Sequence, residues 1–152
     1  MPGLTYHNYS LSRLLTVRDI VSFDRVIGDT HTRSPHFHAD AWELICCKSG
    51  SVTVWKDGQE NHLNPGQILM VQPGVQHDSQ QHAGETLFIS FTCPEDKYLS
   101  MLGSTVFRVS ANEGMLLNRA LEEVQEAFQT SNNQVRIHEF KPNADSPLGS
   151  EH

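Results

Sequence analysis

The residues with the clearest chemical potential lie in the stretch "PHFHADAWELICCKSG" within residues 34–50. It places His36, His38 and Glu43 close together, and a fourth candidate, His77, follows later in the chain. Three imidazoles and one carboxylate suit a borderline divalent ion such as zinc, nickel, iron or manganese. The same groups can also line a pocket without a metal and hydrogen-bond an organic ligand. The residue types leave both alternatives open.

The spacing of these residues predicts that their side chains converge. His36 and His38 are two residues apart, so an extended chain projects both from the same face. Glu43 has the opposite parity, but a turn at Ala39-Asp40 resets the alternation before the next strand begins. A Pro-Gly turn then delivers His77. We therefore expect all four side chains to reach one shared ion or ligand.

Short strands are the elements that must position this cluster. Runs rich in β-branched and aromatic residues alternate with Gly, Pro and Asn turns, at 20–28, 41–48, 51–55, 67–71, 86–93 and 105–109. The Asp57-Gly58 dipeptide is a strong signal for a tight hairpin. This pattern predicts a β-sandwich or a small barrel. Trp55, which ends one of the strands, either packs in the barrel wall or stacks on a ligand, and we keep it as a ligand-binding candidate.

One amphipathic helix is predicted after the strands, over residues 111–130. Ser110 and Glu113 have the spacing of a capping box, which satisfies orphan backbone N–H groups at a helix start. Apolar residues then recur at steps of three and four, at Leu117, Ala120, Leu121, Val124, Ala127 and Phe128. This stripe should pack on the barrel or on a partner helix. Residues 131–152 lose the periodicity and are rich in Pro, Asn and Ser, which predicts a linker.

Composition narrows the functional classes. The chain has 152 residues, enough for one well-filled core, and its formal net charge is −7. This acidic balance argues against DNA binding by the chain itself, because duplex binding depends on clustered Lys and Arg. No apolar run approaches the roughly 20 residues that span a bilayer, so no membrane association is expected. The three cysteines, Cys46, Cys47 and Cys93, are too few and too irregular for a disulfide framework, which favours a cytoplasmic protein.

Two motifs resemble those of the cupins. His36-x-His38-x4-Glu43-x6-Gly50 is similar to the first cupin motif, and Gly66 followed by Pro73-Gly74-x2-His77 is similar to the second. The resemblance implies a mainly β double-stranded β-helix, the jelly-roll barrel, followed here by the C-terminal helix. In metal-binding cupins these His and Glu positions coordinate the ion. Gln72 and Gln81 depart from the family pattern, but neither departure removes a ligand.

The stretch "HADAWELICCKSGSVTVWKDGQENHLNPGQILMVQPGVQH" (38–77) is followed by a strand that ends in Ser90-Phe91-Thr92-Cys93, then by a short connector, a small strand and an amphipathic helix. Over about residues 20–130 this order resembles the sensor domain of AraC-type bacterial transcriptional regulators. The resemblance implies an N-terminal arm and cupin barrel over 1–109, with residues 4–20 as the arm. It implies a packed helix over 110–130, and a linker over 131–152 that leads to a dimerisation and DNA-binding region outside this chain. A small-molecule effector is then the expected partner, DNA is bound only through the missing domain, and a homodimer is compatible with the family.

A second function class stays open beside the sensor. A stand-alone metal-dependent cupin enzyme, an isomerase or an oxygenase, would use His36, His38, Glu43 and His77 as ligands. No separate acid–base pair near the motifs stands out, so no catalytic residue is assigned. The sensor is therefore the favoured prediction.

Overall fold

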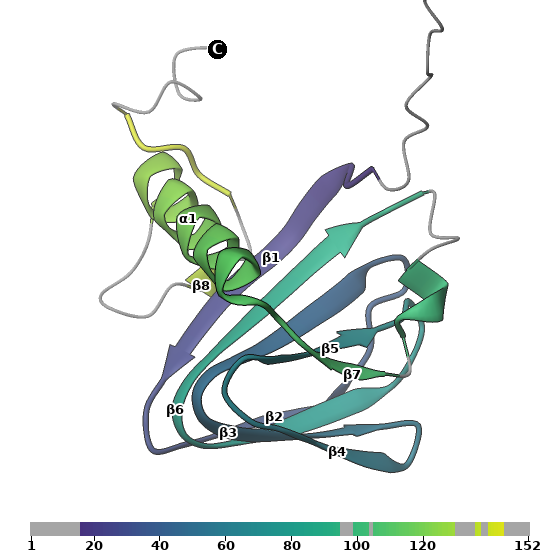
Figure 1. Ribbon diagram of the computed structural model, residues 1–152. Helices are drawn as coiled ribbons and strands as arrows, with labels where there is room; N and C mark the ends of the chain where they lie inside the picture. The colour runs from purple at the N-terminus through teal and green to yellow at the C-terminus, as the bar shows by residue number, and fades with distance from the viewer. Residues whose placement is uncertain (1–15, 95–98, 104, 130–135, 138–139, 145–152) are drawn as a thin grey trace, which may run out of the picture.

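The computed structural model describes residues 16–94, 99–103, 105–129, 136–137 and 140–144. Eight strands, all paired antiparallel, are joined by a short 3-10 helix (Leu99–Met101) and one α-helix. In chain order these elements are β1 (Asp19–Ile27), β2 (Thr30–His36), β3 (Trp42–Lys56), β4 (Gln59–Leu63), β5 (Gln67–Val71), β6 (His77–Thr92), β7 (Val106–Arg108), α1 (Ala111–Ala127) and β8 (Arg136–Ile137). Figure 1 shows the strands folded into a barrel with α1 on its outside. The predicted mainly β jelly roll with one C-terminal helix is confirmed.

Two long strands, β3 and β6, pair along their whole length and bend together. Their register is irregular around Gly50, where β3 turns the corner. Gly50 and Gly84 both have positive φ, and a Cβ at either position would collide with a backbone carbonyl of the partner strand. Only glycine fits this corner. The predicted strands 41–48 and 51–55 are therefore two halves of one bent strand, because the Ser49-Gly50 signal marks a bend and not a chain reversal.

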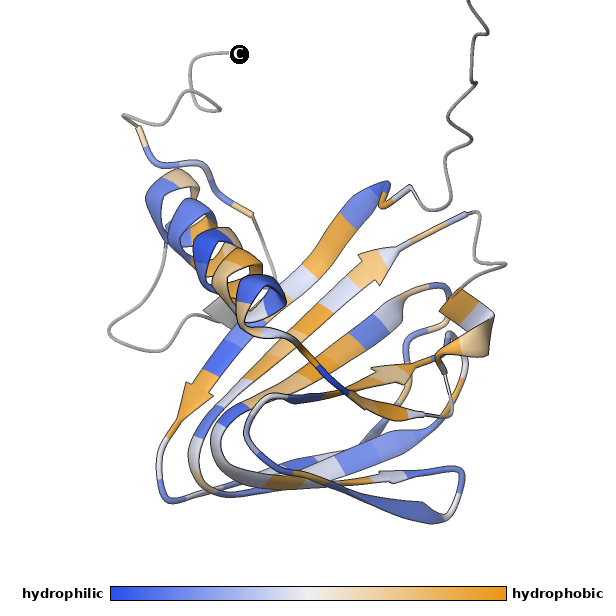
Figure 2. Ribbon diagram, viewed as in Figure 1, coloured by the Kyte–Doolittle hydropathy of each residue, from blue (hydrophilic) through white to orange (hydrophobic). Residues whose placement is uncertain are grey.

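The bend divides the strands into two facing sheets. The first sheet holds β7, β5, the first half of β3, the second half of β6, β1 and β8. The second sheet holds β4, the second half of β3, the first half of β6 and β2. The first sheet is the more hydrophobic of the two in Figure 2. β2 and the first half of β6 carry few apolar residues, and for that reason the sequence pattern did not predict them as strands.

Apolar residues form one core inside the barrel and another outside it. The inner core lies between the two sheets and contains Val26, Ile45, Cys47, Val52, Val54, Leu63, Leu69, Val71 and Phe88. The outer core lies between the first sheet and α1, and its buried members include Phe23, Trp42, Cys46, Met70, Leu87, Phe91, Leu121 and Val124. The first sheet is thus buried on both faces. Cys46, Cys47 and Cys93 are all buried, and none of them is part of a disulfide within the described residues.

The helix α1 begins as predicted. The Ser110 hydroxyl accepts a hydrogen bond from the backbone N–H of Glu113, whose carboxylate accepts one from the N–H of Ser110. Leu121 and Val124, in the predicted stripe, are buried against the sheet. The helix ends at Ala127, because the next residue is extended and bridges to a later segment of the chain.

Part of the predicted linker, residues 131–152, is packed on the barrel and on α1. β8 pairs with β1, and the Ile137 side chain is buried in the outer core. Asn143 donates its backbone N–H to the carbonyl of Ala127. These packed pieces are too short to show a periodicity in the sequence. Most of the predicted arm, residues 4–15, and the last part of the predicted linker, 145–152, lie outside the described residues.

No helix in the described part of the chain is both long and apolar enough to cross a membrane.

Candidate metal centre

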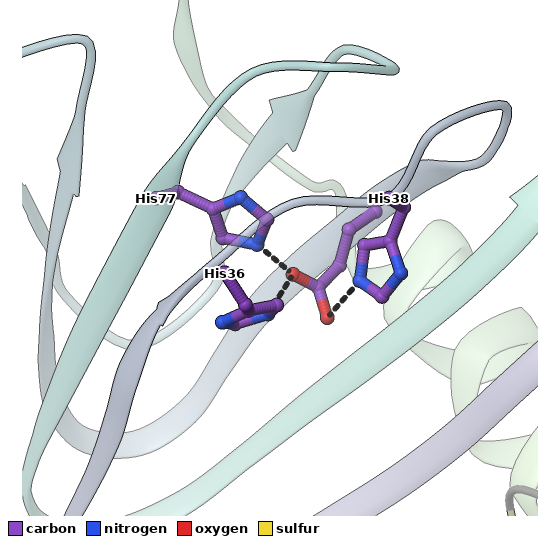
Figure 3. Close-up of side chains that lie close together, drawn as sticks. His36, His38 and His77 are labelled. Atoms are coloured by element: carbon purple, nitrogen blue, oxygen red, sulfur yellow. Dashed lines mark hydrogen bonds and ion pairs between the residues drawn. The ribbon is translucent and has the colours of Figure 1, made fainter.

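His36, His38, Glu43 and His77 come together at one end of the barrel interior (Figure 3). His36 ends β2, His77 begins β6, and these two residues pair across the second sheet. His38 lies in the loop that follows β2, and Glu43 lies near the start of β3 in the first sheet. One ligand atom from each residue lies within 4.8 Å of all the others. The structure thus brings together the four residues that the sequence selected.

Hydrogen bonds to the main chain fix two of the three rings. His36 donates from Nδ1 to the carbonyl of Ser34 at 2.8 Å, and His77 donates from Nδ1 to the carbonyl of Val75 at 3.0 Å. A carbonyl oxygen only accepts, so both Nδ1 atoms carry a proton. In the neutral rings, Nε2 is therefore the nitrogen with a free lone pair. Both Nε2 atoms are turned toward Glu43.

The Glu43 carboxylate lies at the centre of the cluster, with 1% of its side chain exposed. Its Oε2 lies 2.5 Å from Nε2 of His77 and 3.9 Å from Nε2 of His36. Its Oε1 lies 3.9 Å from Nε2 of His38 and 3.4 Å from Nη1 of Arg33. One carboxylate oxygen therefore faces two imidazoles, and the other faces the third imidazole and a guanidinium.

Arg33 and Asp24 are parts of the site that the sequence reasoning missed. Arg33, on β2, forms an ion pair with buried Asp24 on β1 and lies with its guanidinium 4.0 Å from the ring centre of Phe88. The same guanidinium contacts Glu43, so it connects two carboxylates of the first sheet to the second sheet. Strand alternation alone puts Arg33 and His36 on opposite faces of β2, because they are three residues apart. A register shift between them brings both side chains to the inner face, and the sequence pattern does not show this irregularity.

Burial and the neighbouring charges shift the pKa values of the cluster in opposite directions. Burial alone would raise the pKa of Glu43, but the nearby His38 imidazole, the hydrogen bond with His77 and the charge of Arg33 bring it well below its ordinary value. Burial works to lower the pKa of His77, and its hydrogen bond with Glu43 outweighs that effect and raises it. Burial lowers the pKa of the more distant His36. The folded chain thus favours an ionised carboxylate at the centre of the three rings.

This arrangement fits a divalent metal ion. The donors are three imidazole nitrogens and one carboxylate oxygen, the set that zinc, nickel, iron and manganese accept. The proton on Nδ1 of His36 and of His77 leaves Nε2 of each ring available as a ligand. The carbonyls that hold these rings, and the guanidinium beside Glu43, are the outer partners that orient ligands in metal sites.

Trp55 lies elsewhere. It is on β3 between the inward-facing Val54 and Lys56, so its side chain leaves the opposite face of the strand. It lines a pocket on the outer face of the second sheet, where it is half-buried. Lys56, which pairs with His77 across the sheet, is buried and donates to the carbonyl of Gly103, and burial lowers its pKa. Trp55 therefore leaves the sheet on the face opposite to the His and Glu cluster, and the pocket that it lines touches the cluster only at His77.

Comparison with known proteins identifies the family. The family model of the AraC-like ligand binding domain matches residues 22–105, more than half of the chain. The chain belongs to this family. The matched region includes all four residues of the cluster and the strands that carry them. An AraC-like ligand-binding domain binds an effector, in agreement with the resemblance noted in the sequence.

The similar proteins either match only part of this chain or share little sequence identity with it. Quercetin 2,3-dioxygenase from Bacillus subtilis (strain 168) is 34% identical over 59 residues, which is 39% of this chain and 18% of that protein. ToxT from Vibrio cholerae, in complex with (E)-4-(8-methylnaphthalen-1-yl)but-3-enoic acid, has a TM-score of 0.51 at 11% identity, covering 72% of this chain and 49% of ToxT. KdgF from Halomonas sp. has a TM-score of 0.42 at 17% identity, covering 53% of this chain and 74% of KdgF. At these identities the structural likeness to ToxT concerns the fold alone.

Proposed function

We propose that this chain is the effector-sensing domain of an AraC-type transcriptional regulator, which acts in the cytoplasm. The observation that carries the proposal is the convergence of His36, His38, Glu43 and His77 inside a barrel of the AraC-like ligand-binding family. A small molecule would enter at this end of the barrel and contact these side chains. Such a site combines an apolar interior with a few convergent polar groups, as small-molecule sites do.

We propose further that His36, His38, Glu43 and His77 hold one divalent ion, with zinc, nickel, iron and manganese as the candidates. When bound, such an ion would supply Lewis acidity toward an oxygen or nitrogen of the effector. Other groups of the protein hold the ligating side chains in position. The Ser34 and Val75 carbonyls orient two of the rings, and Arg33 holds the carboxylate of Glu43 in place.

Signalling in this proposal requires two arrangements of the domain. The effector must bind one arrangement better than the other, or it shifts nothing. The change would act through the N-terminal segment or through α1, which packs on the outside of the first sheet. The DNA-binding domains of the whole regulator, as a homodimer, would respond to it. DNA would be contacted only by those domains.

Thermal-shift measurements provide the direct test of effector binding. The chain, stripped with a chelator and free of a polyhistidine tag, is screened against small metabolites with and without each of the four metals. A ligand that binds only the folded state raises the midpoint of unfolding, by an amount that grows with ligand concentration. Elemental analysis of untagged protein purified without added metal measures the occupancy. Failure of every metal to bind, together with unchanged midpoints across the screen, would contradict the proposal.

DNA binding is the second test. Fluorescence anisotropy of this chain with duplex DNA at low salt should show no saturable binding, because the net charge is −7. A salt-sensitive isotherm in the micromolar range would mean that the domain contacts DNA itself.

A metal-dependent cupin enzyme is the second candidate. The donor set of the cluster and the 59-residue likeness to quercetin 2,3-dioxygenase favour it. The two candidates differ in stoichiometry. A sensor binds about one effector per chain and returns it unchanged, whereas an isomerase or oxygenase converts many equivalents of the compound once the metal is restored. Mass spectrometry of each compound that raises the unfolding midpoint distinguishes them.

A further inference from the structure

A pocket lies on the outer face of the second sheet, at the end where His77 begins β6. Its volume is about 490 Å³, and Trp55, Asp57, Asp78, Pro35 and Gln76 contribute to its walls, with an edge of His77. This volume lies within the range of small-molecule sites, about 300–1,000 Å³.

The sheet register and one tight turn build the pocket. Trp55 on β3 pairs directly with Asp78 on β6, so the two side chains lie next to each other on the outer face. The Asp57-Gly58 turn, with positive φ at both residues, carries a carboxylate to the end of this row. The backbone N–H of Asp57 donates to the carbonyl of Gln76 at 3.4 Å and ties the turn to the start of β6.

The side chains that line the pocket favour a positively charged ligand. Among the residues that line the pocket are an indole and two carboxylates, and there is no Lys or Arg. The neighbouring Lys56 turns inward and donates to the carbonyl of Gly103, so its charge is not available on this face. In addition, Oδ1 of Asp78 is buried and has no hydrogen-bond partner in the part of the chain that the structure describes. A buried carboxylate oxygen without a partner is unfavourable, and a nearby positive charge offsets that cost.

We propose that this pocket binds a small protonated alkylamine. The ammonium group lies over the indole of Trp55 and between the carboxylates of Asp57 and Asp78, while the alkyl chain runs along Pro35. Aromatic faces attract ammonium groups through their quadrupole, and the two carboxylates add a direct charge interaction. The pocket shares only an edge of His77 with the metal centre, and its indole and its two carboxylates lie outside the four converging residues.

Amide chemical shifts in the isotopically labelled, folded chain test the proposal. Cadaverine is the probe, glutarate is the anionic control of the same chain length, and N-acetyl-lysine methylamide represents a lysine side chain of a protein. We expect saturable shifts at residues 55–58 and 76–78 with cadaverine, a dissociation constant near or below about 1 mM, and weakening by added salt. Glutarate should leave these signals in place. Binding of the lysine derivative as tightly as cadaverine would overturn the assignment to a free amine in favour of a protein side chain.

Three variants identify the binding groups. Trp55→Leu removes the indole and Asp78→Asn removes one charge, and each should weaken cadaverine binding at least about fivefold. Asp29→Asn removes the same charge in the exposed β1–β2 turn, far from the pocket lining, and should change nothing. Asp78→Asn keeps the shape of the side chain, so it tests the proposal even if the Trp55→Leu variant does not fold. Equal affinity in Asp78→Asn and the unmodified chain, or no saturable shift with cadaverine, would overturn the proposal.

Discussion

The two sheets of the barrel differ in how much of them is buried, and β6 shows the difference within a single strand. Its second half, in the first sheet, carries Leu87 in the outer core and Phe88 in the inner core. Its first half, in the second sheet, turns His77, Ser79 and Gln81 inward and leaves polar residues on the outer face. The first sheet is covered on both faces, whereas the second is covered on one.

Because of this difference in burial, the first sheet contributes more to stability, and the second sheet can carry more polar functional groups. The first sheet gains burial from the barrel interior and from α1, so most of its positions take apolar residues. The second sheet has to bury only its inner face and can carry histidines at the end of that face. The candidate metal centre lies where the sheets face each other, with Glu43 from the first and His36 and His77 from the second. The contrast predicts a graded series of mutational effects.

The largest effect is expected for an outward-facing residue of the first sheet. Leu87→Ala should lower the free energy of unfolding by about 3–4 kcal/mol, because Leu87 is fully buried beneath α1 and its loss leaves a cavity. Gln80→Ala, on the outer face of the second sheet in the same strand, should cost less than about 1 kcal/mol. Urea unfolding of both variants measures the two values. Similar losses at the two positions would remove the distinction between the sheets.

The ion pairs of Arg33 should come next, because they connect the sheets. Arg33→Met removes the ion pair of Arg33 with buried Asp24 and the contact of Arg33 with Glu43, and we expect a loss of about 3 kcal/mol in the free energy of unfolding. Replacing the partner as well, in Arg33→Met with Asp24→Leu, should recover at least about 1 kcal/mol of that loss. Chemical unfolding of the single and double variants gives the interaction free energy. Strictly additive effects of the two substitutions would show that the pair does not act as a unit.

The metal affinity of the centre should depend on the charge of Glu43. Glu43→Gln keeps the shape of the side chain but removes an anionic ligand, so zinc binding should weaken at least about tenfold while the circular dichroism spectrum stays the same. Competition with a chromophoric chelator measures the affinity, and Asp29→Asn is the control for the loss of one negative charge. Unchanged affinity in Glu43→Gln would exclude Glu43 as a ligand.

The smallest effect is expected on mild acidification of the metal-free chain. The pKa of Glu43 is lowered on folding from an ordinary value of 4.5, so its stabilisation is present above that pH and is lost as the pH falls through the folded pKa. Between about pH 5.5 and pH 4.5 the unmodified chain should lose about 0.4 kcal/mol more than Glu43→Gln, because the unfolded carboxyl is half protonated at pH 4.5.

In the unmodified chain this pH window isolates Glu43 from His77. Glu43→Gln removes the hydrogen bond that raises the pKa of His77, so His77→Gln is introduced into both proteins for the comparison. The pKa of His77 is raised on folding from 6.5, so its contribution is complete below pH 6.5 and constant across the window. Urea unfolding at several pH values in both proteins provides the comparison. Equal losses in the two proteins would mean that Glu43 does not lose its stabilising charge on acidification.

The sequence by itself determined the class of fold and the four residues of the cluster. The turn-bounded runs of β-branched residues predicted a barrel, and the capping box at Ser110 predicted the helix that follows it. The spacing of His36, His38, Glu43 and His77 was sufficient to select them. These signals are local, since they depend on strand alternation, turn chemistry and capping within a few residues.

Only the tertiary structure decided how the strands pair and which side chains lie on the same face of a sheet. It showed that residues 41–48 and 51–55 form one bent strand, because a backbone clash with the partner strand fixes the corner at Gly50. It brought Arg33 to Glu43, and it put Trp55 outside the barrel. Such contacts join strands that are distant in sequence, and their geometry follows from sheet register and from the packing of one sheet on the other, which no local pattern encodes.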